Sequence, residues 1–152
     1  MSLQQEVEIL RNIPLFAQIE LSKLKLIAFT SDRMIFRPGE VLCHEGDEGD
    51  AAYIVIRGEA EVSIASPQGP YRISTLGPND ILGEIAILCD VPRTATVTAR
   101  TELEALVISK DLFYRLIQEF PQIAIGLLRE LAGRLDQTTA RLREAVQLAG
   151  DI

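Results

Sequence analysis

Apolar residues along the chain follow a helical period at both ends and a strand period between them. Near the N-terminus they recur every three positions in 7–13 and again in 21–27, on either side of Pro14. Because such spacing places apolar side chains on one helical face, it predicts short amphipathic helices. We expect these helices to cover the part of the chain that follows.

Between residue 33 and about residue 109, short β-rich runs alternate with turn residues. This pattern predicts a compact antiparallel barrel or roll. The turn dipeptides that separate the runs are Pro38-Gly39, Gly46-Asp47, Gly49-Asp50, Arg57-Gly58, Gly69-Pro70 and Gly77-Pro78.

Two neighbouring runs show the strand character most directly. Ala60, Val62 and Ile64 alternate with polar residues, which predicts a strand with one buried and one solvated face. Residues 53–56 are continuously apolar, as in a strand covered on both faces. With the turn at Gly58 between them, the two runs predict a β-hairpin.

After Ser109 the helical period returns, breaks at Phe120-Pro121 and continues in a long helix to about Leu148. An apolar seam with alternating steps of three and four residues follows this helix, and such a seam requires a partner. We therefore expect a parallel homodimer through the helix at 121–148. The alternative is that this helix packs on its own roll. The seam comprises Leu128, Leu131, Leu135, Thr138, Leu142 and Ala145.

The length of 152 residues and the hydrophobic content of 47% suit one globular domain with its own core. We therefore expect a single domain, residues 1–152, that is mainly β with flanking helices. Its parts are N-terminal helices in 1–32, an antiparallel β-roll in 33–109, and C-terminal helices in 110–152.

Charge limits the partners that the chain can take. The formal net charge is −7, and the sequence lacks the Lys/Arg clusters that contact duplex phosphates, so nucleic acid is not an expected partner. No apolar stretch reaches the length of a membrane span, and the N-terminus lacks the layout of a signal peptide. We expect a cytoplasmic protein.

Few residues are candidates for metal or redox chemistry. Cys43 and Cys89 form no CxxC pair and His44 is the only histidine, so a zinc or haem site would lack ligands. We expect both thiols to be reduced and half-buried. A cupin-like enzyme on a similar roll would need several histidine and carboxylate ligands, so we expect neither a cofactor nor enzymatic activity.

The segment 82–97 carries the residues with the clearest chemistry. It reads Leu-Gly-Glu-Ile-Ala-Ile-Leu from residue 82 and, after a short loop, Pro-Arg-Thr-Ala-Thr-Val from residue 92. Gly83 permits close backbone approach, and a short helix after it would offer free N–H groups to an anion. Arg93 can hold a phosphate through two parallel hydrogen bonds. Glu84 would repel phosphate, so we expect it to accept from a hydroxyl.

Both halves of this segment, at this spacing, resemble the phosphate-binding cassette of cyclic-nucleotide-binding domains. That family includes catabolite activator protein, kinase regulatory subunits and cyclic-nucleotide-gated channels. Leu82 stands where the family usually has Phe, which changes apolar packing and leaves the polar positions intact. The resemblance covers nearly the whole chain, including residues 10–16, 38–40, 45–47 and 57–62.

The resemblance implies a fold and a set of contacts. The fold would be a β-roll of the double-stranded β-helix or jelly-roll kind. Glu84 would bind the ribose 2′-OH of a 3′,5′-cyclic nucleotide, and Arg93 would bind its exocyclic phosphate oxygens. The other expected contacts are backbone N–H groups at Gly83, Ile85, Ala86, Thr94 and Ala95, and apolar packing at Val62 and Ile73.

Base choice rests on two further resemblances. Thr94 occupies a position that is Thr in cGMP-selective kinase sites and also in channel domains that take both nucleotides. Residues 134–139 resemble the dimer helix of catabolite activator protein, so Thr138 and Thr139 would contact the adenine amino group, one from each subunit. The alternative is that these threonines are ordinary surface residues.

The sequence thus predicts a regulatory sensor that binds cAMP, in preference to cGMP, and transmits occupancy through its C-terminal helices. Three alternatives stay open. In the first, Glu84 and Arg93 form only a surface ion pair, which contributes little to stability. In the second, the domain has lost its ligand and binds a protein partner. In the third, it is the sensor part of a longer transcription regulator with a helix-turn-helix.

Overall fold

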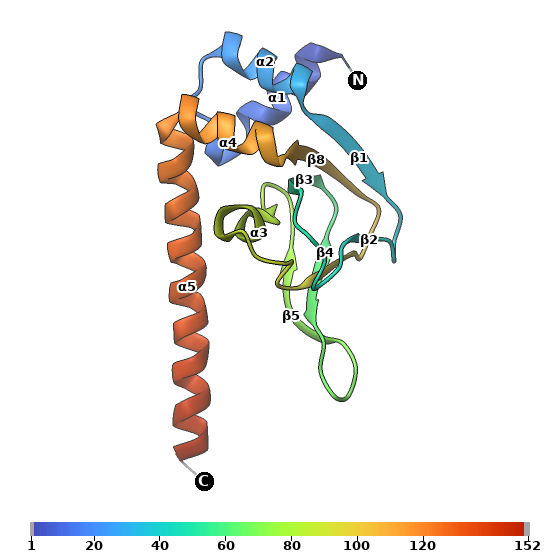
Figure 1. Ribbon diagram of the computed structural model, residues 1–152, viewed down its shortest axis with the longest axis vertical. Helices are drawn as coiled ribbons and strands as arrows, with labels where there is room; N and C mark the ends of the chain where they lie inside the picture. The colour runs from blue at the N-terminus through green and yellow to red at the C-terminus, as the bar shows by residue number, and fades with distance from the viewer. Residues whose placement is uncertain (1, 151–152) are drawn as a thin grey trace.

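The computed structural model describes residues 2–150, in which eight strands form two four-stranded antiparallel sheets (Figure 1). One sheet has the strand order β1-β8-β3-β6 and the other has the order β2-β7-β4-β5. The strands are β1 (Asp32–Phe36), β2 (Val41–Cys43), β3 (Ala51–Arg57), β4 (Ala60–Ile64), β5 (Tyr71–Leu76), β6 (Ile81–Leu82), β7 (Thr96–Ala99) and β8 (Leu103–Ser109).

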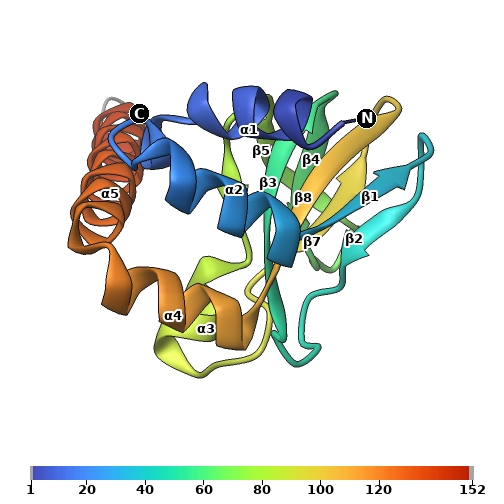
Figure 2. The same ribbon diagram turned by 90° about the horizontal axis from the view of Figure 1, so that it is seen from above.

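Helices flank this roll at both ends of the chain and interrupt it once. The first, second and fourth α-helices gather over one end of the roll, and the fifth runs alongside it (Figure 2). The predicted fold class, an antiparallel β-roll with flanking helices and a long C-terminal helix, is therefore confirmed. The helices are α1 (Leu3–Arg11), the 3-10 turn η1 (Pro14–Phe16), α2 (Leu21–Thr30), α3 (Glu84–Cys89), α4 (Lys110–Glu119) and α5 (Pro121–Gly150).

Local sequence explains where the helices begin. The Ser2 side chain accepts a hydrogen bond from the backbone N–H of Gln5, and the Gln5 side chain accepts one from the Ser2 N–H, which satisfies otherwise unpaired donors. At α4 the Ser109 side chain accepts a hydrogen bond from the Leu112 N–H and so caps the helix. Pro121 opens α5, because proline has no N–H to lose at a first helical position.

The predicted hairpin around Gly58 is wrong. β3 pairs with β8 and β6, whereas β4 pairs with β5 and β7, so the turn carries the chain from one sheet to the other. Gly58 has a φ of +93°, and a Cβ there would lie 2.8 Å from the Cα of Leu103. Only glycine therefore fits this crossing. The burial alternation also fades along β4, where Ile64 is 37% exposed.

Two hydrophobic clusters support the site. One joins the helices to the β3 and β8 face and includes Phe16, Ile54, Ile87 and Phe113. The other fills the roll and includes Leu82. Segment 81–87 therefore lies between two packed cores, which fixes the start of α3. In the described part of the chain, no helix is both long enough and apolar enough to cross a membrane.

Candidate functional site

A cavity of about 680 Å³ lies between α3, the inner face of the β4–β5 sheet and α5. It collects residues that are far apart in the sequence. Of the candidate ligand residues expected from the sequence, the structure brings all but Thr139 to this cavity. The lining members of that set are Val62, Ile73, Gly83, Glu84, Ile85, Ala86, Arg93, Thr94, Ala95 and Thr138.

The predicted short helix after Gly83 is present as α3. Gly83 is its N-cap with a φ of +85°, a backbone conformation that side chains strongly disfavour. A Cβ at this position would collide with the Arg93 guanidinium and lie 2.9 Å from the Ala51 carbonyl oxygen. Glycine is therefore required both by the turn and by the close approach of the arginine.

The loop at 45–50 positions both halves of the segment. Its backbone exchanges two hydrogen bonds with Arg93, from the Arg93 N–H to the Asp47 carbonyl at 2.7 Å and from the Gly46 N–H to the Arg93 carbonyl at 2.9 Å. A Cβ on Gly49 would collide with the Cβ of Ala86 on α3. Residues 45–47 belong to the family resemblance, and only the structure shows that this loop positions Arg93 and α3.

The Arg93 side chain is buried, with 5% of its surface exposed. Its guanidinium donates to the Ala51 carbonyl at 2.8 Å and to the Gly83 carbonyl at 3.3 Å, and it lies 3.7 Å from the carboxylate of Asp50. Asp50 is largely exposed to solvent, so its charge compensates Arg93 only weakly. A buried cation held mainly by neutral carbonyls favours an anion in the cavity.

Glu84, the first residue of α3, is 1% exposed. Its Oε1 accepts a hydrogen bond from Arg134 at 2.9 Å, while its Oε2 is buried without a partner. Burial raises the pKa of the Glu84 carboxyl, and the Arg134 guanidinium opposes that rise. A buried, unpaired acceptor is costly, so the free oxygen calls for a hydroxyl or another donor in the cavity.

Arg134 is the functional residue that sequence reasoning missed. Besides Glu84, its guanidinium donates to the Ile81 carbonyl at 2.7 Å and to Glu130 at 2.9 Å. It thereby fastens the middle of α5 to the first turn of α3. The resemblance in residues 134–139 points to the threonines, and spacing along a helix does not show which side chain faces the roll. Arg129, five residues earlier on the same helix, also lines the cavity.

The remaining walls are apolar or weakly polar. Val62 on β4 is half-buried, and Ile73 on the edge strand β5 is 40% exposed. Both Thr138 and Thr139 donate their hydroxyl hydrogens to their own helix, to the carbonyls of Arg134 and Leu135 at 2.9 Å each. Their oxygens therefore remain available as acceptors, and in this chain only Thr138 faces the cavity.

The two cysteines differ in environment. Cys43 is half-buried as expected and lines the cavity, and burial raises the pKa of its thiol despite the nearby Arg93. Cys89 is exposed, so the expectation of a half-buried thiol is wrong there. In residues 2–150, no group of three or more His, Cys, Asp or Glu side chains is arranged to hold a metal ion.

Comparison with known proteins gives one consistent family. Residues 33–120 match the cyclic nucleotide-binding domain. The chain is 32% identical over 140 residues to a CRP-like cAMP-activated global transcriptional regulator of Mycobacterium tuberculosis, covering 91% of this chain and 62% of that protein. It is 37% identical over 108 residues to a cAMP-dependent protein kinase regulatory subunit of Yarrowia lipolytica, covering 71% of this chain and 28% of that one.

A solved structure agrees. The catabolite activator protein of Thermus thermophilus has a TM-score of 0.75 and 27% identity, over 85% of this chain and 61% of that protein. The chain thus spans less than two thirds of the curated relatives it matches. The family match covers residues 33–120, more than half of the 152 residues, and includes both halves of segment 82–97. The chain therefore belongs to the cyclic nucleotide-binding domain family.

Proposed function

We propose that this domain is a regulatory sensor whose cavity binds cAMP, without catalysing a reaction on it. One observation carries the proposal: a buried arginine, Arg93, and a buried carboxylate with an unpaired oxygen, Glu84, face the same cavity. A small molecule with an anionic group and a hydroxyl group would bind both side chains, the anion to Arg93 and the hydroxyl to Glu84. A 3′,5′-cyclic nucleotide carries both, as phosphate and as ribose 2′-OH.

In this proposal Arg93 binds the exocyclic phosphate oxygens, together with N–H groups at the start of α3 and at Thr94 and Ala95. The unpaired Oε2 of Glu84 accepts from the 2′-OH. Val62 and Ile73 pack against the sugar and base. The two curated relatives are named for cAMP, which supports cAMP over cGMP as the ligand.

Signal transmission would pass through Arg134. One oxygen of Glu84 holds Arg134 and the other would hold the ligand, so the two contacts share a single carboxylate. Ligand binding would therefore change the position or rigidity of α5, and it can do so only to the extent that it binds one arrangement of the helix more tightly.

Calorimetric titration of the chain with cAMP, cGMP and 5′-AMP tests the ligand directly. We expect cAMP to bind more tightly than cGMP, and 5′-AMP to bind weakly because its phosphate is not tied to the ribose 3′-oxygen. Absence of binding by either cyclic nucleotide would instead favour a domain that has lost its ligand.

Glu84→Ala is expected to weaken cAMP binding by about 1.5–3 kcal/mol, the range for hydrogen bonds to charged groups. Glu84→Gln should cost less, because its amide oxygen still accepts from the 2′-OH. The wild type should also bind 2′-deoxy-cAMP more weakly than cAMP, and Glu84→Ala should lose that distinction. If 2′-deoxy-cAMP and cAMP bind the wild type equally, Glu84 does not contact the ribose.

The pH dependence of binding should report the same carboxyl. Burial raises the pKa of Glu84, so its charge and one acceptor site are lost as the pH falls through that raised value, and cAMP affinity should fall with them. Arg134 opposes the rise, so Arg134→Met should move the loss of affinity to higher pH. The charge of Glu130 also raises the pKa of Glu84, so it acts in the same direction as burial and against Arg134.

Arg129→Met is the matched control, since Arg129 lines the cavity from the same helix and is outside the hydrogen bonds to Glu84 described above. The cAMP dissociation constant is measured for each variant over a pH series that starts at the ordinary range of a glutamate and extends upward from it. If Arg134→Met and Arg129→Met shift the pH at which cAMP affinity is lost by the same amount, Glu84 is not the carboxyl that causes this loss.

We also propose that α5 pairs with its counterpart in a second copy. Thr138 would then face the base within one subunit, and Thr139 of the partner subunit would approach the same base across the interface. The exposed leucines of α5 support this arrangement.

A further inference from the structure

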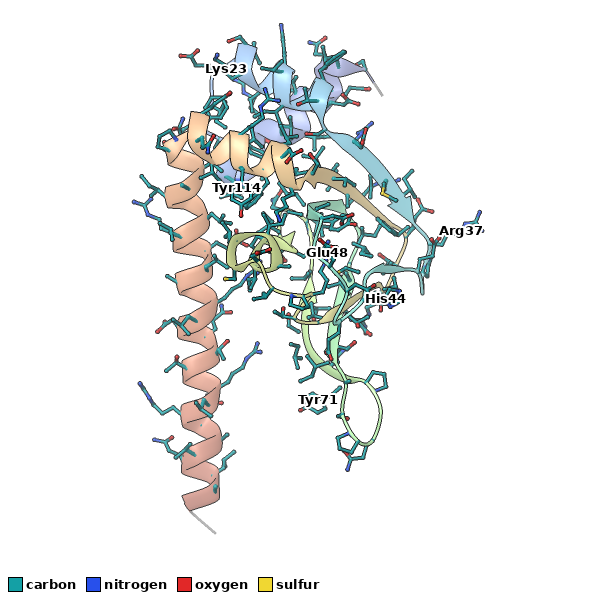
Figure 3. The ribbon with its side chains drawn as sticks, in the orientation of Figure 1. Lys23, Arg37, His44, Glu48, Tyr71 and Tyr114 are labelled. Carbon is teal, nitrogen blue, oxygen red and sulfur yellow. The ribbon has the colours of Figure 1, made fainter. Side chains whose placement is uncertain are left out.

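The two ends of the short helix α3 are held differently. Its first turn faces the cavity with Gly83 and Glu84. Its last turn faces α4, and the Tyr114 hydroxyl donates to the Ile87 carbonyl at 2.8 Å across that boundary. Figure 3 shows Tyr114 in the space between α4 and α3. The cavity therefore lies at one end of α3 and a tyrosine contact lies at the other.

The carbonyl that Tyr114 binds belongs to the last turn of α3, where carbonyls have no partner within the helix. The N–H groups of Asp90 and Val91 both turn to the Ala86 carbonyl instead, which leaves the Ile87 carbonyl to the tyrosine. Ile87 itself is fully buried. The Tyr114 hydroxyl thus replaces the hydrogen bond that the end of α3 lacks.

A second polar contact lies one turn earlier on the same face of α4. Lys110 is 3.8 Å from the carboxylate of Asp90, the C-cap residue that follows α3. Both of these side chains are well exposed, so their attraction is weak. Lys110 and Tyr114 are four residues apart and therefore face the same way. One face of α4 thus contacts the C-terminal end of α3 twice.

The tyrosine ring is held independently of its hydroxyl. Phe113, buried in the core, meets the Tyr114 ring edge to face with centroids 6.2 Å apart. Tyr114→Phe can therefore remove the hydroxyl and leave the ring packed. α4 leads through Phe120 directly into α5, whose residues 129–138 line the opposite wall of the cavity.

From this geometry we propose that Tyr114 is a positioning residue that sets ligand affinity without touching the ligand. Six residues are too few for a helix to be stable by itself, so its contacts determine where α3 lies. Through the Ile87 carbonyl, Tyr114 fixes α3 relative to the α4–α5 arm. Gly83 and Glu84 on α3 then face Arg134 and Thr138 on α5 across the cavity. The inference rests on the proposed binding of cAMP.

The test compares Tyr114→Phe with Tyr71→Phe in the full chain. Tyr71 begins β5, is 64% exposed and lies by the β4–β5 loop, away from α3 (Figure 3). Two quantities are measured: amide hydrogen exchange of residues 84–90 without ligand, and the cAMP dissociation constant. We expect Tyr114→Phe to accelerate exchange in 84–90 and to raise the dissociation constant about two- to tenfold, the effect of one ordinary hydrogen bond. Tyr71→Phe should change neither.

A purely structural tyrosine would lower the thermal stability of free and bound protein alike and leave the cAMP dissociation constant unchanged. An unchanged constant for Tyr114→Phe, or unchanged exchange in 84–90, therefore overturns the inference. If the wild type binds no cyclic nucleotide, the proposed function fails instead. The exchange measurement on ligand-free protein then still decides whether Tyr114 holds the end of α3.

Discussion

Replacing Arg93 by Ala is expected to weaken cAMP binding by about 2–5 kcal/mol, the cost of removing one partner of a buried charge contact. This corresponds to roughly thirtyfold to several thousandfold in dissociation constant. The arginine is 5% exposed and its guanidinium is fixed by the Ala51 and Gly83 carbonyls. The fold therefore holds a preorganised cation at the cavity, and in the alanine variant the phosphate of the proposed ligand would have no charged partner there.

Arg93→Lys separates charge from geometry. A lysine keeps the positive charge but cannot form two parallel hydrogen bonds. We therefore expect the cAMP affinity of Arg93→Lys to lie between that of the wild type and that of Arg93→Ala. Arg100→Ala is the control, because it removes an arginine whose side chain is half-exposed and forms a surface ion pair with Glu59 at 3.9 Å. Affinity is measured by calorimetry and folding by thermal unfolding. A folded Arg93→Ala protein with wild-type affinity would refute the site assignment.

Leu135→Glu is expected to dissociate the proposed homodimer. Leu128, Leu135 and Leu142 follow one stripe of α5 and are 67%, 67% and 64% exposed. Burying a leucine contributes about 1.5–3 kcal/mol, and the substitution acts once in each subunit. The dimer dissociation constant should therefore rise at least about a hundredfold. Leu131 does not belong to the free stripe, because it packs against its own core.

Ala140→Glu is the matched control, since it adds the same charge to an exposed position of α5 outside the leucine stripe. Sedimentation of the wild type and both variants, with and without cAMP, measures the association. If cAMP contacts both subunits, it should strengthen pairing, and pairing should raise cAMP affinity by the same factor. A wild type that stays monomeric at high concentration in both conditions excludes the dimer.

The cassette could be read in the sequence because its requirements are local. Gly83 must be glycine because of its left-handed turn and the close approach of the Arg93 guanidinium. The glycine therefore stands at a fixed sequence spacing from Glu84 and Arg93. The roll could be read because turn residues recur between short β-rich runs. Both features, segment 82–97 and the roll, could be predicted without knowledge of which strands pair.

Pairing itself could not be read. Residues 53–56 and 60–64 are joined by a turn that looks like a hairpin connection, yet Gly58 takes the chain from one sheet to the other, where β3 pairs with β8 and β6, and β4 pairs with β7 and β5. Local alternation reports which face is apolar, whereas the choice of neighbour depends on the whole set of strands. The hairpin prediction failed for this reason.

By itself, the sequence indicated the fold class, the position of segment 82–97 and eleven candidate ligand residues, of which the structure places ten along one cavity. Only the tertiary structure decided that Arg134 pairs with Glu84, that Thr139 faces away from this cavity, and that Tyr114 reaches the end of α3. The reason is that a helical pattern gives the spacing of side chains along α4 and α5 but not the rotation of those helices against the roll. Packing of the two hydrophobic clusters sets that rotation, and with it the partners of every polar side chain on the helices.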